Sequence, residues 1–387
     1  MLKKVLTVIA VLTVLAAGAG LSIVLQRSER AAQARDADRD LRARPDDPGE
    51  AQEPDDEDEP LADRVTAPPD GQAYWGIFRF GAPYDLRKVA GVHDDVGLWP
   101  SIMMWYQEWH GQALFDLRSA RYLREHDIVP MVTWEPWEPP EQFGDLVVDQ
   151  PRYALARIAE GDFDGYIVQY ALAVREFGGP VMMRPFHEMD GFWYPWGGLV
   201  NGNTPADFVA AWRHVHDVFE GVGATNATWV WSVNHLSVPD TPENAITNYW
   251  PGGHYVDWIG ISGFNWGDAS DFSTWKTFDE VYADRYADLA EYKKPIALTE
   301  VAAPEVGGDK PSWIQQSFDT LLTRYPKIKA VIWYDKRDSD VRDWRIDSSP
   351  EALAAFRAAV SRPEMLSAPA AVAAATPSPT LQSDATD

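Results

Sequence analysis

The chain has 387 residues, no cysteine and a formal net charge of -25 at pH 7. A charge this negative excludes nucleic acid and anionic membrane surfaces as favoured partners, and leaves a neutral polysaccharide compatible. Without cysteine there is no disulfide framework, so stability must come from a hydrophobic core, which a chain of this length can build.

The first 25 residues carry an export pattern. Lys3 and Lys4 precede an apolar run from Val5 to Leu25 that is long enough to span a bilayer. Ala17-Gly18-Ala19 inside this run is similar to a signal-peptidase site. Residues 1–25 are therefore predicted to be a signal peptide or a signal anchor, the latter forming a membrane tether through residues 5–25. Either outcome predicts an extracellular protein, secreted or anchored at the outer face of the cell membrane.

Two polar segments flank an apolar, tryptophan-rich centre. Residues 26–70 are charged and proline-bearing, and Asp46 to Asp63 contains acids but neither Lys nor Arg, which predicts a disordered acidic spacer. Residues 363–387 are rich in Ala, Pro, Ser and Thr and are predicted to be a disordered tail. Residues 71–362 are predicted to form a single folded domain.

Eight apolar runs of β-prone residues follow one another along this domain. They are Tyr74–Phe78, Ser101–Tyr106, Val129–Trp134, Val181–Phe186, Thr228–Val233, Trp258–Gly263, Ile296–Thr299 and Ala330–Tyr334. Helical spacing of apolar residues marks Leu114–His126, Phe163–Phe177, Pro205–Glu220, Phe278–Tyr292 and Ser312–Tyr325. Thr204 and Pro205 are predicted to cap and start the third of these helices. Eight strands alternating with helices predict an α/β fold of the closed (β/α)8 or TIM-barrel type.

Polar and aromatic side chains gather where the predicted strands end. In a (β/α)8 barrel the carboxyl ends of the strands and their loops build the active site. The residues at these ends are Trp105, Tyr106, Trp134, Glu135, His187, Glu188, Asn234, His235, Asn265, Trp266, Glu300, Trp333 and Asp335.

Two glutamates stand out among them. Glu188 follows the fourth predicted strand, and Glu300 ends the seventh. Strands four and seven lie roughly across the barrel mouth, so the two carboxyl groups can face one another over a bound sugar. A carboxylate pair cleaves glycosidic bonds, and a separation of roughly 5 to 5.5 Å indicates a retaining mechanism. Burial beside Arg184 and His187 favours a raised pKa for the Glu188 carboxyl, as proton donation requires.

The dipeptide His187-Glu188 also suggests a metalloprotease. That motif requires a second histidine three residues after the glutamate, where Gly191 stands, so neither a metal nor a cofactor is predicted. His187 is expected to bond to substrate or to the nucleophile instead.

Tryptophans near the strand ends indicate a carbohydrate cleft. Trp134, Trp193, Trp196 and Trp333 are expected to be exposed, because sugar rings stack on indoles while their hydroxyls seek polar partners. The predicted substrate-binding residues are His187, Arg184, Trp193, Trp134, Trp105, Asn234, Phe264 and Trp333.

Several segments together resemble glycoside hydrolase family 26, which contains many β-mannanases, over about residues 74–357. They are 130–137 (PMVTWEPW), 184–193 (RPFHEMDGFW), 249–252 (YWPG), 256–260 (VDWIG), 299–300 (TE) and 331–334 (VIWY). The resemblance implies that Glu188 is the acid/base and Glu300 the nucleophile. It also implies that His187, Trp193 and Trp333 contact the sugar beside the scissile bond. Family members commonly end strand six with a tyrosine that bonds to the nucleophile, and the matching residue here is Phe264.

We therefore expect an exported, retaining endo-β-glycanase that acts on β-1,4-mannan or a related β-linked polysaccharide. One alternative is a hydrolase of mixed-linkage β-glucan, xylan or exopolysaccharide. Another is a catalytically inactive glycan-binding protein that keeps the tryptophan trough, although retention of both glutamates argues against it. The sequence predicts no particular oligomeric state.

Overall fold

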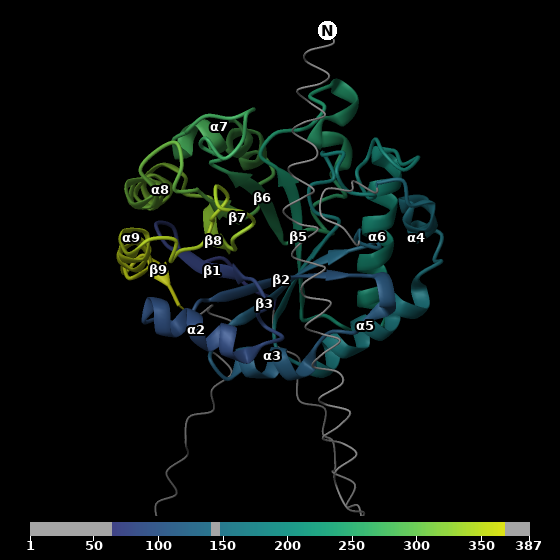
Figure 1. Cartoon of the computed structure of the whole chain (residues 1–387). Coiled ribbons are helices and arrows are strands. Elements are labelled where there is room, and N and C mark those ends of the chain that lie inside the picture. Colours follow the sequence, from purple (N-terminus) through teal and green to yellow (C-terminus); the bar gives the residue numbers. More distant parts are fainter. Residues whose placement is uncertain (1–63, 141–147, 368–387) are drawn as a thin grey trace, which may run out of the picture.

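The computed structural model describes residues 64–140 and 148–367. The predicted signal segment, most of the acidic spacer and most of the tail lie outside these ranges, so the predictions for them stay untested. Within the described residues, parallel strands close into a barrel that helices surround (Figure 1). No helix of this part of the chain is long and apolar enough to cross a membrane.

The strands follow the predicted order around the barrel. They are β1 (Ala73–Arg79), β2 (Ile102–Glu108), β3 (Val129–Glu135), β4 (Val181–Pro185), β5 (Ala227–Asn234), β6 (Trp258–Phe264), β7 (Ile296–Ala302), β8 (Ile328–Asp335) and the short β9 (Met365–Leu366). Each strand from β2 to β7 pairs with the next one in the chain, and β1 closes the ring by pairing with both β8 and β2. The predicted (β/α)8 fold is confirmed.

Helices fill the connections and cover the outside of the barrel (Figure 1). They are α2 (Leu86–Val96), α3 (Leu117–Arg124), α4 (Leu155–Ala159), α5 (Asp164–Phe177), α6 (Pro205–Gly221), α7 (Phe278–Ala290), α8 (Lys310–Arg324) and α9 (Pro350–Val360), with 3-10 turns at His110–Gln112, Pro151–Tyr153, Pro242–Asn244 and Ile246–Tyr249. Thr204 caps α6 through a reciprocal pair of hydrogen bonds with Asp207, as the sequence predicts for this residue. Helices α2, α4 and α9 were not predicted.

Both ends of the described chain lie at the amino-terminal face of the barrel. Val65 is buried there, and its N–H donates to Thr228 Oγ1 at the start of β5 (2.8 Å). Strand β9 pairs with Ala73 and Tyr74, the first residues of β1. Val65 at one end and Met365 and Leu366 at the other therefore contact the barrel, and the predicted domain limits of 71 and 362 stay a prediction.

Candidate active site

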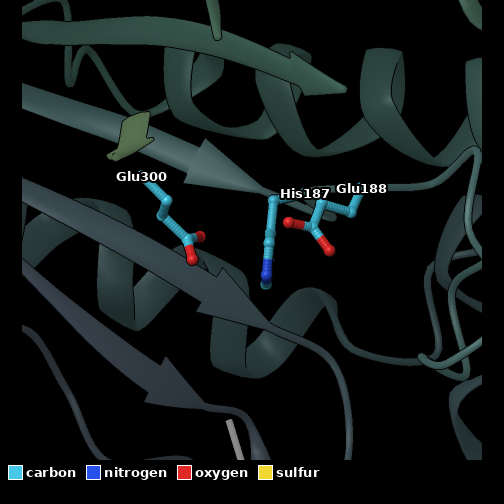
Figure 2. Close-up of side chains that lie close together, drawn as sticks. All are labelled: His187, Glu188 and Glu300. Carbon is cyan, nitrogen blue, oxygen red and sulfur yellow. The ribbon is translucent and has the colours of Figure 1, made fainter. Parts of the chain in front are cut away.

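The structure brings Glu188 and Glu300 together at the carboxyl end of the barrel. Glu188 lies just after β4 and Glu300 lies on β7. One carboxylate oxygen from each and one ring nitrogen of His187 all lie within 4.8 Å of one another. In Figure 2 the imidazole of His187 stands between the two carboxyl groups. This separation fits the short carboxyl spacing of a retaining glycosidase, since inverting enzymes hold their carboxyl groups roughly 6.5 to 9.5 Å apart.

A left-handed backbone turns Glu188 toward the cleft. Phe186 and Glu188 have φ angles of 52° and 54°. Residues other than glycine adopt this left-handed region at a cost of about 1 to 3 kcal/mol each. The Glu188 N–H donates to the Ser232 carbonyl of β5, and the Glu188 carbonyl accepts from Gly191 N–H, both across 2.9 Å. Surrounding contacts of this kind are needed to hold a strained turn in place.

A β-bulge orients Glu300. Ile261 of β6 pairs with Leu298, but the next residue, Ser262, pairs with Glu300, so Thr299 is the extra residue. Adjacent side chains of a regular strand point to opposite faces. Here Thr299 Oγ1 lies 3.0 Å from Ser232 Oγ and Glu300 lies against buried Arg184, so both side chains turn into the barrel. Strand β7 also continues to Ala302, so Glu300 does not end the strand as predicted.

Arg184 holds Glu300 from below. Its Nη1 lies 2.9 Å from Glu300 Oε1 and 3.0 Å from Thr133 Oγ1, and its Nη2 donates to Ser262 Oγ across 2.5 Å. Burial alone lowers the pKa of the guanidinium, but the charge of Glu300 and neighbouring acidic groups raises it by more than burial lowers it. The pKa is therefore raised overall, and Arg184 keeps its charge. The side chain is fully buried and does not line the cleft, so its predicted direct contact with substrate is wrong.

The two glutamates have different electrostatic surroundings. Burial, and then the nearby charge of Glu300, raise the pKa of Glu188 to about 8. Arg184 and a 2.7 Å hydrogen bond from Trp193 Nε1 to Glu188 Oε2 oppose this rise. Glu188 is therefore protonated at neutral pH, whereas Glu300 forms an ion pair with a guanidinium. Two carboxyl groups, one protonated and the other paired with a cation, suit the roles of acid and nucleophile.

The cleft above these groups has mostly aromatic walls. It is lined by Tyr106, Glu188, Trp193, Tyr194, Phe264, Trp266, Glu300, Tyr334, Asp338 and Trp344. The sequence named Glu188, Trp193, Phe264 and Glu300 as site residues and placed Tyr106 and Trp266 at strand ends. It missed Tyr194, Tyr334, Asp338 and Trp344. Tyr334 had a usable signal, because it alternates with outward-facing Trp333 on β8.

Three predicted tryptophans face away from the cleft. Trp105 and Trp134 are fully buried and pack on the helical layer, with ring centroids 6.1 Å from Phe115 and 4.4 Å from Tyr170. Trp333 packs 5.5 Å from Phe356 of α9, and its Nε1 donates to the Trp344 carbonyl across 2.7 Å. Their predicted contact with sugar is wrong, because two-residue alternation along a strand gives the inward positions to their neighbours.

The remaining tryptophans do not form the expected exposed trough. Trp193 lines the cleft with only 1% of its surface exposed and bonds to Glu188. Trp196 is fully buried, and its Nε1 donates to the His187 carbonyl across 2.6 Å. Both indoles brace the loop after β4. The half-buried cleft residue Trp266 is the better surface for a sugar ring.

His187, Asn234 and Phe264 have different surroundings. Neither ring nitrogen of His187 has a hydrogen-bond partner among the described residues, and burial together with Arg184 lowers its pKa well below the usual range, so the ring is neutral. Asn234 Nδ2 donates to the Leu236 carbonyl (2.8 Å) within its own loop, and Asn234 does not line the cleft. Phe264 does line it, 5.3 Å from the ring of Tyr334. Direct contact of His187 with substrate stays a prediction.

Comparison with known proteins agrees with this geometry. A sequence model of glycosyl hydrolase family 26 matches residues 144–331. Endoglucanase H of Acetivibrio thermocellus is 37% identical over 277 residues, which make up 71% of this chain and 28% of that protein. The chain belongs to glycosyl hydrolase family 26. The family resemblance seen in the sequence is confirmed.

Other relatives within family 26 cover smaller parts of the chain. A mannan endo-1,4-beta-mannosidase of Bacillus subtilis (strain 168) is 27% identical over 172 residues, 41% of this chain and 40% of that protein. The beta-1,3-xylanase TXYA of a Vibrio species is 32% identical over 203 residues, 49% of this chain and 42% of that protein. The chain thus matches less than half the length of each of these relatives.

Solved structures of family 26 enzymes share the fold. A β-mannanase from Bacteroides ovatus gives a TM-score of 0.56 at 17% identity, covering 76% of this chain and 90% of that one. A modular endo-β-1,4-mannanase from Cellulomonas fimi gives 0.57 at 15% identity, covering 77% and 72%. At this identity the likeness shows the (β/α)8 barrel alone.

Proposed function

We propose that this chain is a retaining endo-β-glycanase. One observation carries the proposal: two buried carboxyl groups with oxygens within 4.8 Å, one paired with a guanidinium and the other with a raised pKa. This is the arrangement that double displacement at a sugar carbon requires.

The chemistry follows from the two environments. In the first step the Glu300 carboxylate attacks the anomeric carbon while Glu188 gives its proton to the glycosidic oxygen, so the C–O bond breaks and a glycosyl ester forms. In the second step the Glu188 carboxylate takes a proton from a water molecule, whose oxygen attacks the same carbon and releases Glu300. Arg184 stabilises the Glu300 carboxylate before attack and after release.

The relatives favour a neutral β-linked polysaccharide as substrate. Greater identity, over more of the chain, to a protein named endoglucanase than to those named mannosidase makes a β-glucan the first substrate to test and β-1,4-mannan the second. The cleft wall supports neutrality. Among its described lining residues it holds the carboxyl groups of Glu188, Glu300 and Asp338 and no cationic side chain, so it offers an acidic sugar no oppositely charged partner.

A glycan panel tests this function. Wild-type protein is incubated with mixed-linkage β-glucan, β-1,4-mannan, β-1,3-xylan and β-1,4-xylan, with Glu300→Gln as the matched control. We expect reducing ends from wild type alone, internal cleavage by product size, and a first-formed anomer of retained configuration by NMR. Binding of a glycan with no hydrolysis would indicate the inactive glycan-binding alternative, and an inverted anomer would refute the mechanism.

We further propose that the protein is exported and works at the outer face of the cell membrane or beyond it. The charged and apolar pattern of residues 1–25 motivates this. Both ends of the described chain leave the barrel at the face opposite the cleft, so a tether through residues 5–25 would present the cleft outward. Cell fractionation with a protease-protection assay tests the location, and N-terminal sequencing of the mature protein separates a cleaved signal from an anchor.

A further inference from the structure

Asp190 is a buried carboxylate that the mechanism above does not use. It lies two residues after Glu188 and none of its surface is exposed. Its only charged partner among the described residues is Arg285 of α7, whose Nη2 lies 3.2 Å from Asp190 Oδ2. Burying a charged pair costs several kcal/mol per ion in desolvation, so the pair needs a compensating network of hydrogen bonds.

Such a network is present. Asp190 Oδ1 accepts from Asn234 N–H at the end of β5 (2.8 Å), and Oδ2 accepts from Ser237 Oγ (3.0 Å). The Asp190 carbonyl accepts from Val238 N–H (2.9 Å) and from Asn244 Nδ2 (2.7 Å). One residue therefore joins the loop after β4 to β5 and to the loop between β5 and β6.

Arg285 extends this connection to the helical layer. Besides Asp190, it donates to Ser237 Oγ (3.0 Å) and to the His235 carbonyl (3.4 Å). Only 7% of the Arg285 side chain is exposed. The loop after β4 is thus fixed to α7 by a planar guanidinium, which a lysine could not replace bond for bond.

The loop after β4, which Asp190 and Arg285 anchor, has a strained backbone. Phe186 and Glu188 both lie in the left-handed region, so the turn that presents the acid/base is strained and relaxes if its surroundings loosen. A displacement of about 1 Å at a catalytic group lowers a rate by roughly 100-fold. Asp190 follows Glu188 by two residues and itself makes the hydrogen bonds and the ion pair that anchor this segment.

We propose that Asp190, clamped by Arg285, is a positioning residue that holds and electrically tunes the acid/base Glu188, an inference that rests on the function proposed above. Asp190 touches neither the cleft nor the reacting atoms, and acts through Glu188 alone. It does so by fixing the backbone near Glu188 and by holding a buried negative charge two residues from it in the chain.

The charges around Glu188 give the direction of this tuning. Glu300 from β7 and Asp190 raise the pKa of the Glu188 carboxyl, while Arg184 from β4 and the indole of Trp193 lower it. Neutral His187 and the buried hydroxyl of Tyr194 complete the surroundings. Removing the charge of Asp190, and leaving Arg285 uncompensated, therefore makes Glu188 a stronger acid.

Asp190→Asn tests the proposal, because it keeps the shape of the side chain and removes its charge. We expect the alkaline limb of kcat/KM to move to lower pH by about half a unit or more, since a nearby charge shifts a pKa by roughly 1 to 3 units and Arg285 offsets part of this. On aryl glycosides, kcat/KM should fall roughly 10- to 100-fold for poor leaving groups and little for activated ones, because only the former need protonation.

Asp335→Asn is the matched control. Asp335 is also a buried carboxylate and stands at the end of a strand, and Arg79 Nε lies 2.6 Å from its Oδ2. It is not among the main groups that shift the pKa of Glu188. Because each substitution breaks a buried ion pair, both variants should lose thermal stability. Asp335→Asn should nevertheless keep the alkaline limb and the leaving-group dependence of wild type. Equal shifts in both variants, or none in Asp190→Asn, would overturn the proposal.

Two further measurements keep the test decisive. Ser237→Ala, at a half-buried position, removes the hydrogen bond that the hydroxyl donates to Asp190 and the one that it accepts from Arg285. It should lower kcat/KM for poor leaving groups about 2- to 10-fold, on the scale of one to two hydrogen bonds. If wild type hydrolyses no glycan, the Trp193 indole N–H resonance still reports Glu188 titration by NMR. Its inflection should move to lower pH in Asp190→Asn, and an unmoved inflection would refute the positioning role independently of the proposed function.

Discussion

The Trp193 indole donates a 2.7 Å hydrogen bond to Glu188 Oε2, so an aromatic residue of the cleft wall also acts on the proposed acid. A donor stabilises a carboxylate more than a carboxylic acid, and this bond accordingly lowers the pKa of Glu188 against the larger effect of burial. Two residues of the loop after β4 therefore have opposite effects on the pKa of Glu188: Trp193 lowers it and Asp190 raises it.

Trp193→Phe should move the alkaline limb of kcat/KM to higher pH, opposite to the shift expected for Asp190→Asn. The substitution keeps an aromatic ring in the cleft wall and removes the indole N–H that donates to Glu188 Oε2. pH–rate profiles on one glycan measure the effect. Trp196→Phe is the control, because its indole donates to the His187 carbonyl instead. A shift to lower pH in Trp193→Phe would contradict the assigned direction.

The wild-type enzyme should lose activity as pH rises through the pKa of Glu188, about 8. The sign follows from the role, since a general acid must be protonated when the bond breaks, and its pKa lies above that of an ordinary glutamate. The profile of kcat/KM against pH measures this limb. Glu188→Gln cannot titrate, so its residual activity should show no limb in that range, and an unchanged limb would assign it to another group.

Glu300 should become covalently labelled by a slow 2-deoxy-2-fluoro glycoside. The fluorine destabilises the oxocarbenium-like transition state, so the glycosyl ester persists long enough to isolate. Proteolysis and mass spectrometry should place the added mass on the peptide that contains Thr299-Glu300-Val301. Glu300→Gln should take no label. Mass on Glu188 would reverse the two roles.

Trp134→Ala should destabilise the fold rather than weaken glycan binding selectively. Its side chain is fully buried against Tyr170 and Tyr166, and removing a buried aromatic residue costs about 3 to 5 kcal/mol. Denaturant unfolding measures this cost. Trp266→Ala provides the contrast, because Trp266 is half-buried and lines the cleft. It should weaken oligosaccharide binding to a Glu300→Gln background by roughly 1 to 3 kcal/mol, measured by calorimetry. If Trp134→Ala instead weakened oligosaccharide binding without destabilising the fold, and Trp266→Ala did not weaken binding, a role for Trp134 in sugar contact would be supported.

Much of the architecture follows from local patterns in the sequence. The ends of all eight predicted strands lie within three residues of those of β1 to β8, because short apolar runs separated by helical periods have few other ways to become buried. Helix α2 was not predicted, although Asp85 caps its start and Gly97, with φ of 84°, ends it. Its apolar residues are few, so the caps were the stronger signal.

The sequence by itself determined the order of strands and helices, and it determined that Glu188 follows strand four and that Glu300 belongs to strand seven, because burial and turn formation are local properties of the chain. Only the tertiary structure decided which side chains face the cleft. Trp105, Trp134 and Trp333 pack outward because strand alternation gives the inward positions to their neighbours, and the bulge at Thr299 suspends that alternation for Glu300. Asp190 pairs with Arg285, 95 residues away, and Asp338 and Trp344 line the cleft; both arrangements depend on contacts that form only when the barrel closes.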